Sequence, residues 1–180
     1  MNAEIDISNV TLKTERLTLR PWRTDDLADL YEYASVDGVG QMAGWLPHKS
    51  MEESQEILNM FINEKKTFAI EYEGKVIGSL GIDEYDEAEL PEYAGKPGRE
   101  IGYVLSKDYW DRGLMPEAVN AVIRYLFEDV GLNLIVCGHF TDNSRSKRVQ
   151  EKCGFQYVKL RKLETRYGIV KDSRLSVLTR

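Results

Sequence analysis

The stretch that decides the fold is REIGYVLSKDYWDRGLMPEAVNAVIRYL, Arg99–Leu126. Its first part has the character of a strand, Gly113 marks a tight turn, and Pro116 stands where a helix would begin. Apolar residues then recur at helical spacing from Ala118 to Leu126. A strand that runs through a glycine turn into a helix directs several backbone N–H groups and the positive end of the helix dipole at one point. The stretch therefore predicts a phosphate-binding turn.

The composition is that of one acidic, compact domain. The 180 residues are 42% hydrophobic and 30% charged, with a net charge of −6, which predicts a single domain spanning residues 1–180. The acidic balance disfavours broad binding to nucleic acid or to anionic membranes. No apolar run reaches the ~18 residues of a membrane span, and the acidic first residues do not resemble a signal peptide. We therefore expect a cytoplasmic protein, and the two cysteines match neither a disulfide framework nor a zinc site.

The spacing of apolar residues, together with capping and turn residues, predicts the other elements. Ser50 and Glu53 form a capping box, and Gly74-Lys75 is read as a hairpin turn. This order of elements predicts an α/β fold. We expect a right-handed parallel crossover at the opening stretch and a mixed sheet of about six to seven strands flanked by about four helices. The expected elements are strand Thr11–Trp22, a helix capped by Thr24, a helix from Ser50, strands Thr67–Glu73, Val76–Asp83 and Glu100–Leu105, a helix from Pro116, strand Asn133–Phe140, a helix from Asn143 or Ser144 to Cys153, and strands Phe155–Leu163 and Ile169–Leu178.

A second segment, TDNSRSKRVQEKCGF at Thr141–Phe155, is the basic part of this acidic protein. Such a patch suits either a phosphorylated ligand or a solvated helix face. Neither GxGxxG nor GxxxxGK[ST] occurs, so a dinucleotide fold or a P-loop is poorly supported. Ser146 falls in the first turn of the predicted helix, and the cations of the segment are Arg145, Lys147, Arg148 and Lys152.

Read together, these segments resemble the motifs of the GNAT N-acetyltransferases. YWDRGLMPEAV resembles the pyrophosphate-binding motif of that family, [R/Q]-x-x-G-x-[G/A]. REIGYVL before it and NSRSKRVQEKCGF after it resemble the neighbouring motifs at the expected separation. ERLTLRPW near the start and KDSRLSVLTR at the end resemble the RimJ/RimL-type branch. The resemblance extends from Thr14 to Arg180.

The resemblance implies a single GNAT-like domain and acetyl-CoA as co-substrate, without a metal. The sheet is expected to splay between the strand at Glu100–Leu105 and the strand ending at His139, and the pantetheine arm is expected to pair in that gap like an added strand. Trp110 and Met115 depart from the motif, and Pro116 has no N–H. The residues expected at acetyl-CoA are Tyr103, Val104 and Leu105 along the arm, Asp111, Arg112, Gly113, Leu114 and Met115 at the pyrophosphate, and Asn143 and Ser146 beside the arm.

The resemblance also implies direct transfer of the acetyl group to a primary amine, either a protein N-terminus or a small-molecule amine. Many family members place a tyrosine seven residues after the asparagine, to protonate the leaving thiolate. Gln150 stands there and cannot act as an acid. Ser146 resembles the serine proposed for that role in the RimJ/RimL branch, and helix capping is its structural alternative.

Three positions are candidates for the base that accepts the amine proton. They are Glu100 on the cofactor strand, His139 on the facing strand, and Asp83 or Tyr85 at the end of another strand. Each has a structural alternative, and a chain of waters is a further possibility. Trp45 lies in the loop where the family builds acceptor specificity, so it is expected either to wall the acceptor pocket or to fill the core.

Two further alternatives stay open. The acidic loop Asp83–Glu92 either attracts a cationic acceptor or is simply solvated. A rival function of another class is a non-catalytic acyl-CoA-binding sensor, which the missing tyrosine favours. The family resemblance also suggests a homodimer.

Overall fold

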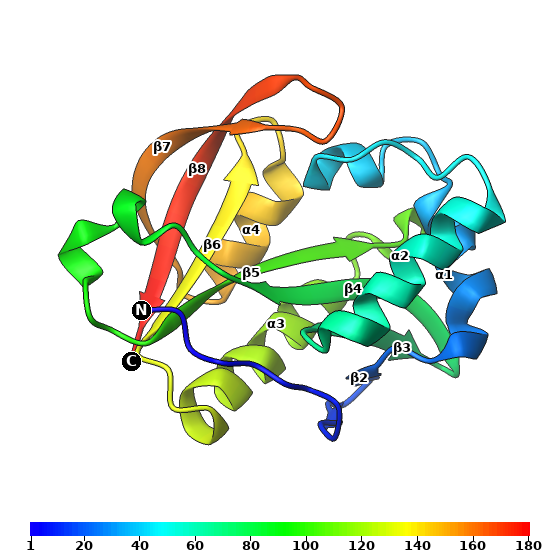
Figure 1. Cartoon of the computed structure of the whole chain (residues 1–180), viewed down its shortest axis with the longest axis horizontal. Coiled ribbons are helices and arrows are strands. Elements are labelled where there is room, and N and C mark those ends of the chain that lie inside the picture. The colour runs from blue at the N-terminus through cyan, green and yellow to red at the C-terminus, as the bar shows by residue number, and fades with distance from the viewer.

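One eight-stranded mixed sheet organises the molecule, in the order β1-β2-β3-β4-β5-β6-β8-β7. The computed structural model describes residues 1–180, and Figure 1 shows helices on both sides of this sheet. The strands are β1 (Leu12–Lys13), β2 (Leu17–Pro21), β3 (Thr67–Tyr72), β4 (Lys75–Asp83), β5 (Gly98–Leu105), β6 (Leu134–Phe140), β7 (Gln156–Glu164) and β8 (Val170–Thr179). The helices are α1 (Leu27–Ala34), α2 (Met51–Glu64), α3 (Leu114–Arg124) and α4 (Ser144–Lys152). The predicted α/β class is confirmed, with eight strands rather than six or seven.

The opening stretch forms the expected strand, turn and helix. Strand β5 pairs with β6 in the only parallel pairing of the sheet, and α3 lies in the crossover between them. The helix begins at Leu114, so the prediction that Pro116 is its first residue is wrong. Pro116 is the third helical residue, where its missing N–H is one that no helix pairs internally. Gly113 precedes the helix with a φ of 73°, a conformation that glycine adopts at little cost.

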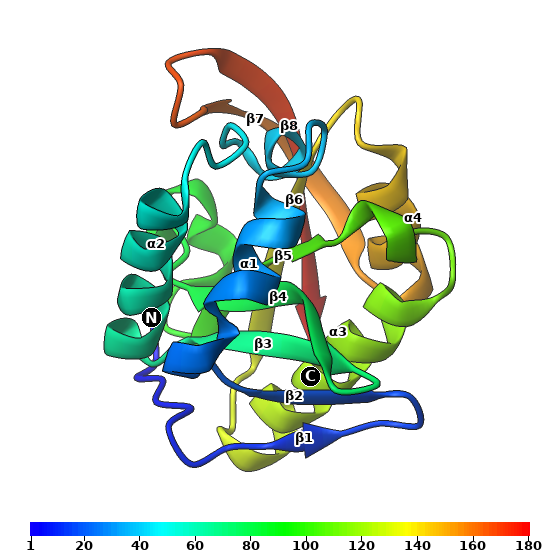
Figure 2. The ribbon, with the colours of Figure 1, turned by 90° about the vertical axis from the view of Figure 1, so that its right-hand side faces the viewer.

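Each face of the sheet carries its own core. On one face, α1 and α2 pack on a cluster that includes Leu30, Leu58 and Ala69. On the other face, α3 and α4 pack on a larger cluster that includes Phe68 and Ile70. Adjacent residues of β3 thus serve opposite layers, as the two-residue period of a strand requires. Figure 2 shows α1 and α2 on one side and α3 and α4 on the other.

The acidic loop after β4 covers part of the sheet. Tyr85 and Leu90 are buried in a third cluster, with residues of β6 and β8. Carboxylates of the loop pair with nearby cations, for example Glu89 with Arg161 at 3.1 Å and Glu84 with Arg99 at 3.9 Å. The loop is therefore a packed cover for this end of the sheet.

Three local predictions need correction. The strand expected over Thr11–Trp22 is two strands, because a turn at residues 14–17 folds β1 back on β2. The β3–β4 turn lies at Glu73 and Gly74, both with positive φ. Thr24 does not cap α1; a 3₁₀ turn precedes that helix, and its buried Asp26 pairs with Arg20 at 2.9 Å.

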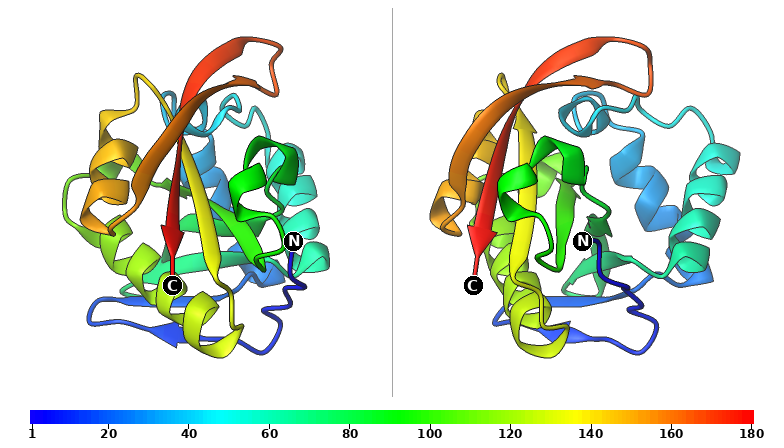
Figure 3. Two further views of the ribbon diagram at one scale, coloured as in Figure 1. Left: turned by 90° about the vertical axis from the view of Figure 1, so that its left-hand side faces the viewer. Right: turned by 60° about the vertical axis from the view of Figure 1, so that its left-hand side comes forward.

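The β7–β8 hairpin arches over the end of the sheet toward the loop between α1 and α2 (Figure 3). The two meet where the N–H of Arg166 donates to the carbonyl of Gly44, at 2.8 Å. Cys137 and Cys153 are buried free thiols. None of the helices has both the length and the apolar character needed to cross a membrane.

Candidate functional site

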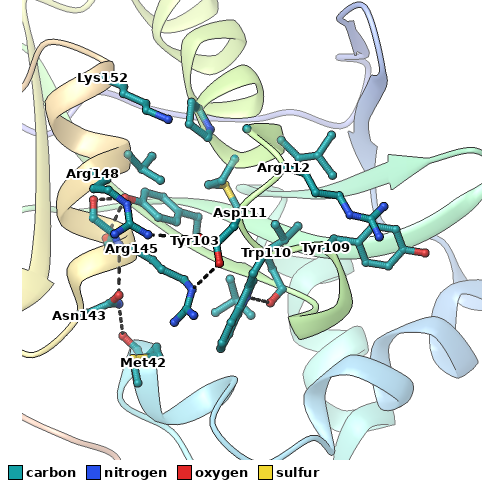
Figure 4. Close-up of a pocket in the computed structure, with 18 of the residues that line it drawn as sticks. Met42, Tyr103, Tyr109, Trp110, Asp111, Arg112, Asn143, Arg145, Arg148 and Lys152 are labelled. Atoms are coloured by element: carbon teal, nitrogen blue, oxygen red, sulfur yellow. Dashed lines mark hydrogen bonds and ion pairs between the residues drawn. The ribbon is translucent and has the colours of Figure 1, made fainter.

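The site begins where two neighbouring strands separate. Strand β5 pairs with β6 only over residues 98–101, whereas residues 102–105 pair with β4 alone. The backbone of the Gly102–Leu105 segment therefore has no strand partner on its β6 side. A cavity of about 310 Å³ opens beside this segment, between the start of α3 and α4 (Figure 4). The predicted splay of the sheet is confirmed.

The turn before α3 forms one wall of this cavity, which is the smaller of the two cavities at the site. Asp111 and Gly113 both have positive φ, 61° and 73°, and α3 starts directly after them. Successive N–H groups in such a turn, at the positive end of an eleven-residue helix, make a concave anion site. Arg16 supports the turn from outside, because its Nη1 donates to the carbonyl of Arg112 at 3.0 Å.

Cationic side chains surround the same cavity. Asp111 holds two of them, with Arg148 at 3.2 Å and Arg145 at 3.5 Å. Arg145 also lies over the ring of Trp110, 4.2 Å from its centroid. Figure 4 shows these side chains converging on the cavity from α4 and from the turn. This donor set fits a polyphosphate: the lining cations are Arg112, Arg145, Arg148 and Lys152.

A buried hydroxyl pair lies deeper in the smaller cavity. The phenol oxygen of Tyr103 is 2.8 Å from Oγ of Ser146 and 3.3 Å from its carbonyl oxygen. Burial raises the pKa of Tyr103 well above its ordinary value, against the opposing effect of hydrogen bonds from Ser146 and Gln150. The phenol thus keeps its proton at any physiological pH. Gln150 completes the group, with Nε2 3.5 Å from the Ser146 hydroxyl and 3.1 Å from the carbonyl of Gly138.

Helix capping does not account for the Ser146 side chain. Asn143 caps α4, since its Oδ1 accepts the N–H of Ser146 at 3.1 Å. The Asn143 amide also donates to the carbonyl of Met42, at 3.4 Å. Asn143 and Ser146 both line the smaller cavity.

A second cavity, of about 600 Å³, lies on the α1–α2 side of the same strand. Trp45 lines it, with its ring packed against Gly40, so this tryptophan forms part of the wall. Gly81 and Gly102 are paired across β4 and β5 and form part of the floor. A Cβ on Gly102 would meet nothing within 4 Å, so the absence of a side chain there opens space. Tyr103 and Val104 line both cavities, so both cavities border this segment.

Two of the predicted catalytic residues lie elsewhere. Glu100 forms an ion pair with Arg161, which also holds Glu89. His139 is 7% exposed, and its Nδ1 is 2.9 Å from the carbonyl of Phe140. Neither side chain lines either of the two cavities. Of the acidic loop, Asp83 alone lines the larger cavity, where it pairs with Lys66 at 2.8 Å.

Two side chains at the site were not singled out from the sequence. Tyr103 was predicted for its backbone alone, because no spacing rule shows that its phenol reaches α4. His48 falls in the glycine-rich loop between the first two helices, and the structure places it on the wall of the larger cavity.

Comparisons with known proteins agree with this geometry. Residues 16–156 match the acetyltransferase (GNAT) domain family. An uncharacterized N-acetyltransferase of Bacillus subtilis (strain 168), YoaA, is 33% identical over 152 residues, covering 81% of this chain and 82% of the relative. No cluster of three or more His, Cys, Asp or Glu side chains is arranged to hold a metal ion.

Solved structures share the fold at lower identity. An acetyltransferase of the GNAT family from Bacillus anthracis superposes with a TM-score of 0.82 at 22% identity, covering 94% of this chain and 98% of that one. A ribosomal-protein-S5-alanine acetyltransferase from Vibrio fischeri superposes with a TM-score of 0.72 at 22% identity, covering 95% and 97%.

Proposed function

The chain belongs to the acetyltransferase (GNAT) family, and from that membership we propose how its two cavities divide the reaction. The protein is an acetyl-CoA-dependent N-acetyltransferase. We assign acetyl-CoA to the smaller cavity and the amine acceptor to the larger one. The amine attacks the thioester directly in a ternary complex. The observation that carries this proposal is that Tyr103 and Val104 line both cavities, so two reactants bound there meet at one strand.

The smaller cavity offers what the cofactor requires along its length. The pantetheine arm would pair with the backbone of Gly102–Leu105, which has no β6 partner. The pyrophosphate would lie on the N–H groups of the turn at Asp111–Met115, with Arg112 beside it. Arg145 and Arg148 are held by Asp111 and would exchange that partner for phosphate oxygens.

Ser146 is proposed as the group that protonates the leaving sulfur. As the amine nitrogen bonds to the carbonyl carbon, the C–S bond breaks and its electron pair stays on sulfur. The Ser146 hydroxyl donates its proton there, and Tyr103 donates a hydrogen bond to the Ser146 oxygen. The high pKa of Tyr103 keeps the phenol proton in place, so that it is available for this bond.

The larger cavity is proposed to take a primary amine, either a small-molecule amine or a protein N-terminus. Trp45 walls it from the α1–α2 loop, and its floor is bare at Gly102. A RimJ/RimL-type acceptor, the N-terminus of a protein, has support from the terminal motifs and from the fold shared with the Vibrio fischeri ribosomal-protein acetyltransferase. The alternative function, a non-catalytic acyl-CoA sensor, is favoured by one observation, the glutamine at position 150.

One experiment separates these functions. The protein is incubated with acetyl-CoA and a panel of small primary amines, polyamines and peptides with free N-termini, and free thiol is followed. Acetyl-CoA affinity is measured in parallel by calorimetry. We expect thiol release that depends on one acceptor class. Tight acetyl-CoA binding without turnover on any acceptor would support the sensor, and absence of binding would refute both functions.

A further inference from the structure

A buried histidine on the wall of the acceptor cavity has no role in the reaction described so far. His48 lies in the loop between α1 and α2, is 8% exposed, and lines the larger cavity. The chain has two histidines, and the other, His139, lines neither cavity. His48 is therefore the one imidazole with access to the space where the acceptor is proposed to bind.

The imidazole is held in one orientation. Its Nδ1 lies 2.7 Å from Oγ of Ser54, a side chain with no solvent exposure. The backbone N–H of His48 donates to the carbonyl of Ala34 at 2.9 Å, and the Trp45 ring lies 5.2 Å from the imidazole. Nε2 has no hydrogen-bond partner and keeps some accessible surface, on a residue that lines the larger cavity.

Burial keeps this imidazole neutral. Desolvation lowers the pKa of His48 below its ordinary 6.5, with Glu53 opposing the shift and Arg166 adding to it. In the tautomer in which Nδ1–H donates to Ser54, the neutral imidazole presents the lone pair of Nε2. The other titratable groups that line the same cavity are Tyr33, Lys49, Glu64, Lys66, Asp83, Tyr103 and Tyr167.

The carboxylates of the cavity are already engaged. Asp83 pairs with Lys66 at 2.8 Å, and Glu64 reaches the same ammonium at 3.6 Å. Glu53 accepts the N–H of Lys49 at 2.7 Å. A group committed to a cation or to a backbone N–H is a weaker proton acceptor than an unpartnered imidazole nitrogen.

We propose that Nε2 of His48 is the general base of the acetyl transfer, an inference that rests on the two-cavity function above. It accepts the proton that the amine nitrogen loses as the N–C bond forms, directly or through one water. The C–S bond breaks, sulfur takes the electron pair, and its proton comes from the Ser146 hydroxyl. The imidazolium returns its proton to water, which reprotonates Ser146, so the reaction releases amide and free thiol with no other reactant.

The tautomer and the pKa of His48 can be measured without an acceptor. We would record imidazole nitrogen NMR spectra of the protein with acetyl-CoA over a pH series, and assign the His48 signals by comparison with His139→Gln. We expect the proton on Nδ1, Nε2 unprotonated at neutral pH, and titration below pH 6.5. A proton on Nε2 at neutral pH, or titration above 6.5, would overturn the proposal.

Kinetics supply the second measurement. With the best acceptor of the amine panel, His48→Ala is expected to lower kcat by about 10²-fold or more, and added imidazole to restore part of it. His139→Ala is the matched control, a buried histidine removed outside both cavities, and is expected to keep the wild-type kcat and to show no imidazole effect. His48→Gln, which fills about the same space, is expected to fold and to remain slow. A rate loss caused by misfolding of the alanine variant can therefore be distinguished from a rate loss caused by removal of the base.

Failure of this inference differs from failure of the proposed function. Wild-type turnover in folded His48→Gln, or rate loss in His48→Ala that imidazole does not restore, would exclude His48 while leaving acetyl transfer intact. Absence of turnover by the wild-type protein would instead refute the proposed function.

Discussion

The phenol oxygen of Tyr103 lies 2.8 Å from the hydroxyl of Ser146, and this contact joins strand β5 to helix α4 across the gap where the sheet opens. Both side chains line the cavity assigned to acetyl-CoA. The tyrosine that the family places on the helix is Gln150 here, and a phenol from the facing strand reaches the same region. In the proposed reaction, this contact would orient the serine proton toward the leaving sulfur.

Ser146→Ala is expected to lower kcat by about 10²-fold with little change in acetyl-CoA affinity, because a proton donor acts on the transition state rather than on the bound cofactor. Steady-state kinetics and calorimetry measure the two quantities. A wild-type kcat in this variant would remove the serine from the mechanism.

Tyr103→Phe is expected to lower kcat by about tenfold, because it frees the Ser146 hydroxyl to rotate without removing it. The double variant with Ser146→Ala should be no slower than Ser146→Ala alone, since the phenol acts through the serine. Additive losses would assign Tyr103 a separate role.

Gly113→Ala is expected to cost about 1 kcal/mol of folding free energy and to raise the KM for acetyl-CoA severalfold, because an alanine at positive φ strains the turn that holds the pyrophosphate. Gly95→Ala is the control. Gly95 has a φ of 80° in the connection between β4 and β5 and lines neither cavity. That variant should lose similar stability, measured by urea unfolding, and keep the wild-type KM.

Substitution of Gly102 should alter acceptor use without altering cofactor affinity. A Cβ there would meet nothing within 4 Å and would enter the larger cavity. We expect Gly102→Ala to raise the acceptor KM slightly and Gly102→Phe to raise it by about tenfold or more, because the ring occupies the floor. A loss of acetyl-CoA affinity as large as the rise in acceptor KM, measured by calorimetry, would contradict the two-cavity assignment.

Glu117→Gln should destabilise the fold by about 1 kcal/mol at neutral pH. The Glu117 carboxylate accepts from Thr14 at 2.6 Å and from the Arg16 side chain at 2.9 Å, and so ties the start of α3 to the β1–β2 turn. Burial raises its pKa, but the bonds from Thr14 and Arg16 outweigh this and lower the pKa below 4.5.

A lowered carboxyl pKa gives the sign of the pH dependence. The stabilisation is present above pH 4.5 and is lost as pH falls through the folded-state pKa. The difference between wild type and Glu117→Gln in urea midpoint should therefore shrink in acid. Glu128→Gln, which changes an exposed glutamate, should show no difference at either pH. A difference in urea midpoint that persists in acid would exclude the carboxylate as the source of the stabilisation.

The order of the elements followed from local patterns. Apolar spacing and turn residues predicted the strand, the turn at Gly113 and the helix, and the family motifs implied acetyl-CoA and the opening of the sheet. Boundaries were less accurate where a tertiary contact decides them. The bond from Thr14 to Glu117 fixes the turn between β1 and β2, although 103 residues separate the two side chains. No local pattern contains such a contact.

The sequence by itself determined the fold class, the strand–turn–helix at Gly113 and the helix that carries Ser146 after Asn143, because these depend on short-range periodicity and capping. The tertiary structure alone decided which side chains face one another. It brought Tyr103 of β5 to Ser146 of α4, placed His48 on the wall of the larger cavity, and tied Glu100 to Arg161. Such contacts depend on how the strands diverge and on which loops close over the sheet, and the spacing of residues along the chain does not encode these distances.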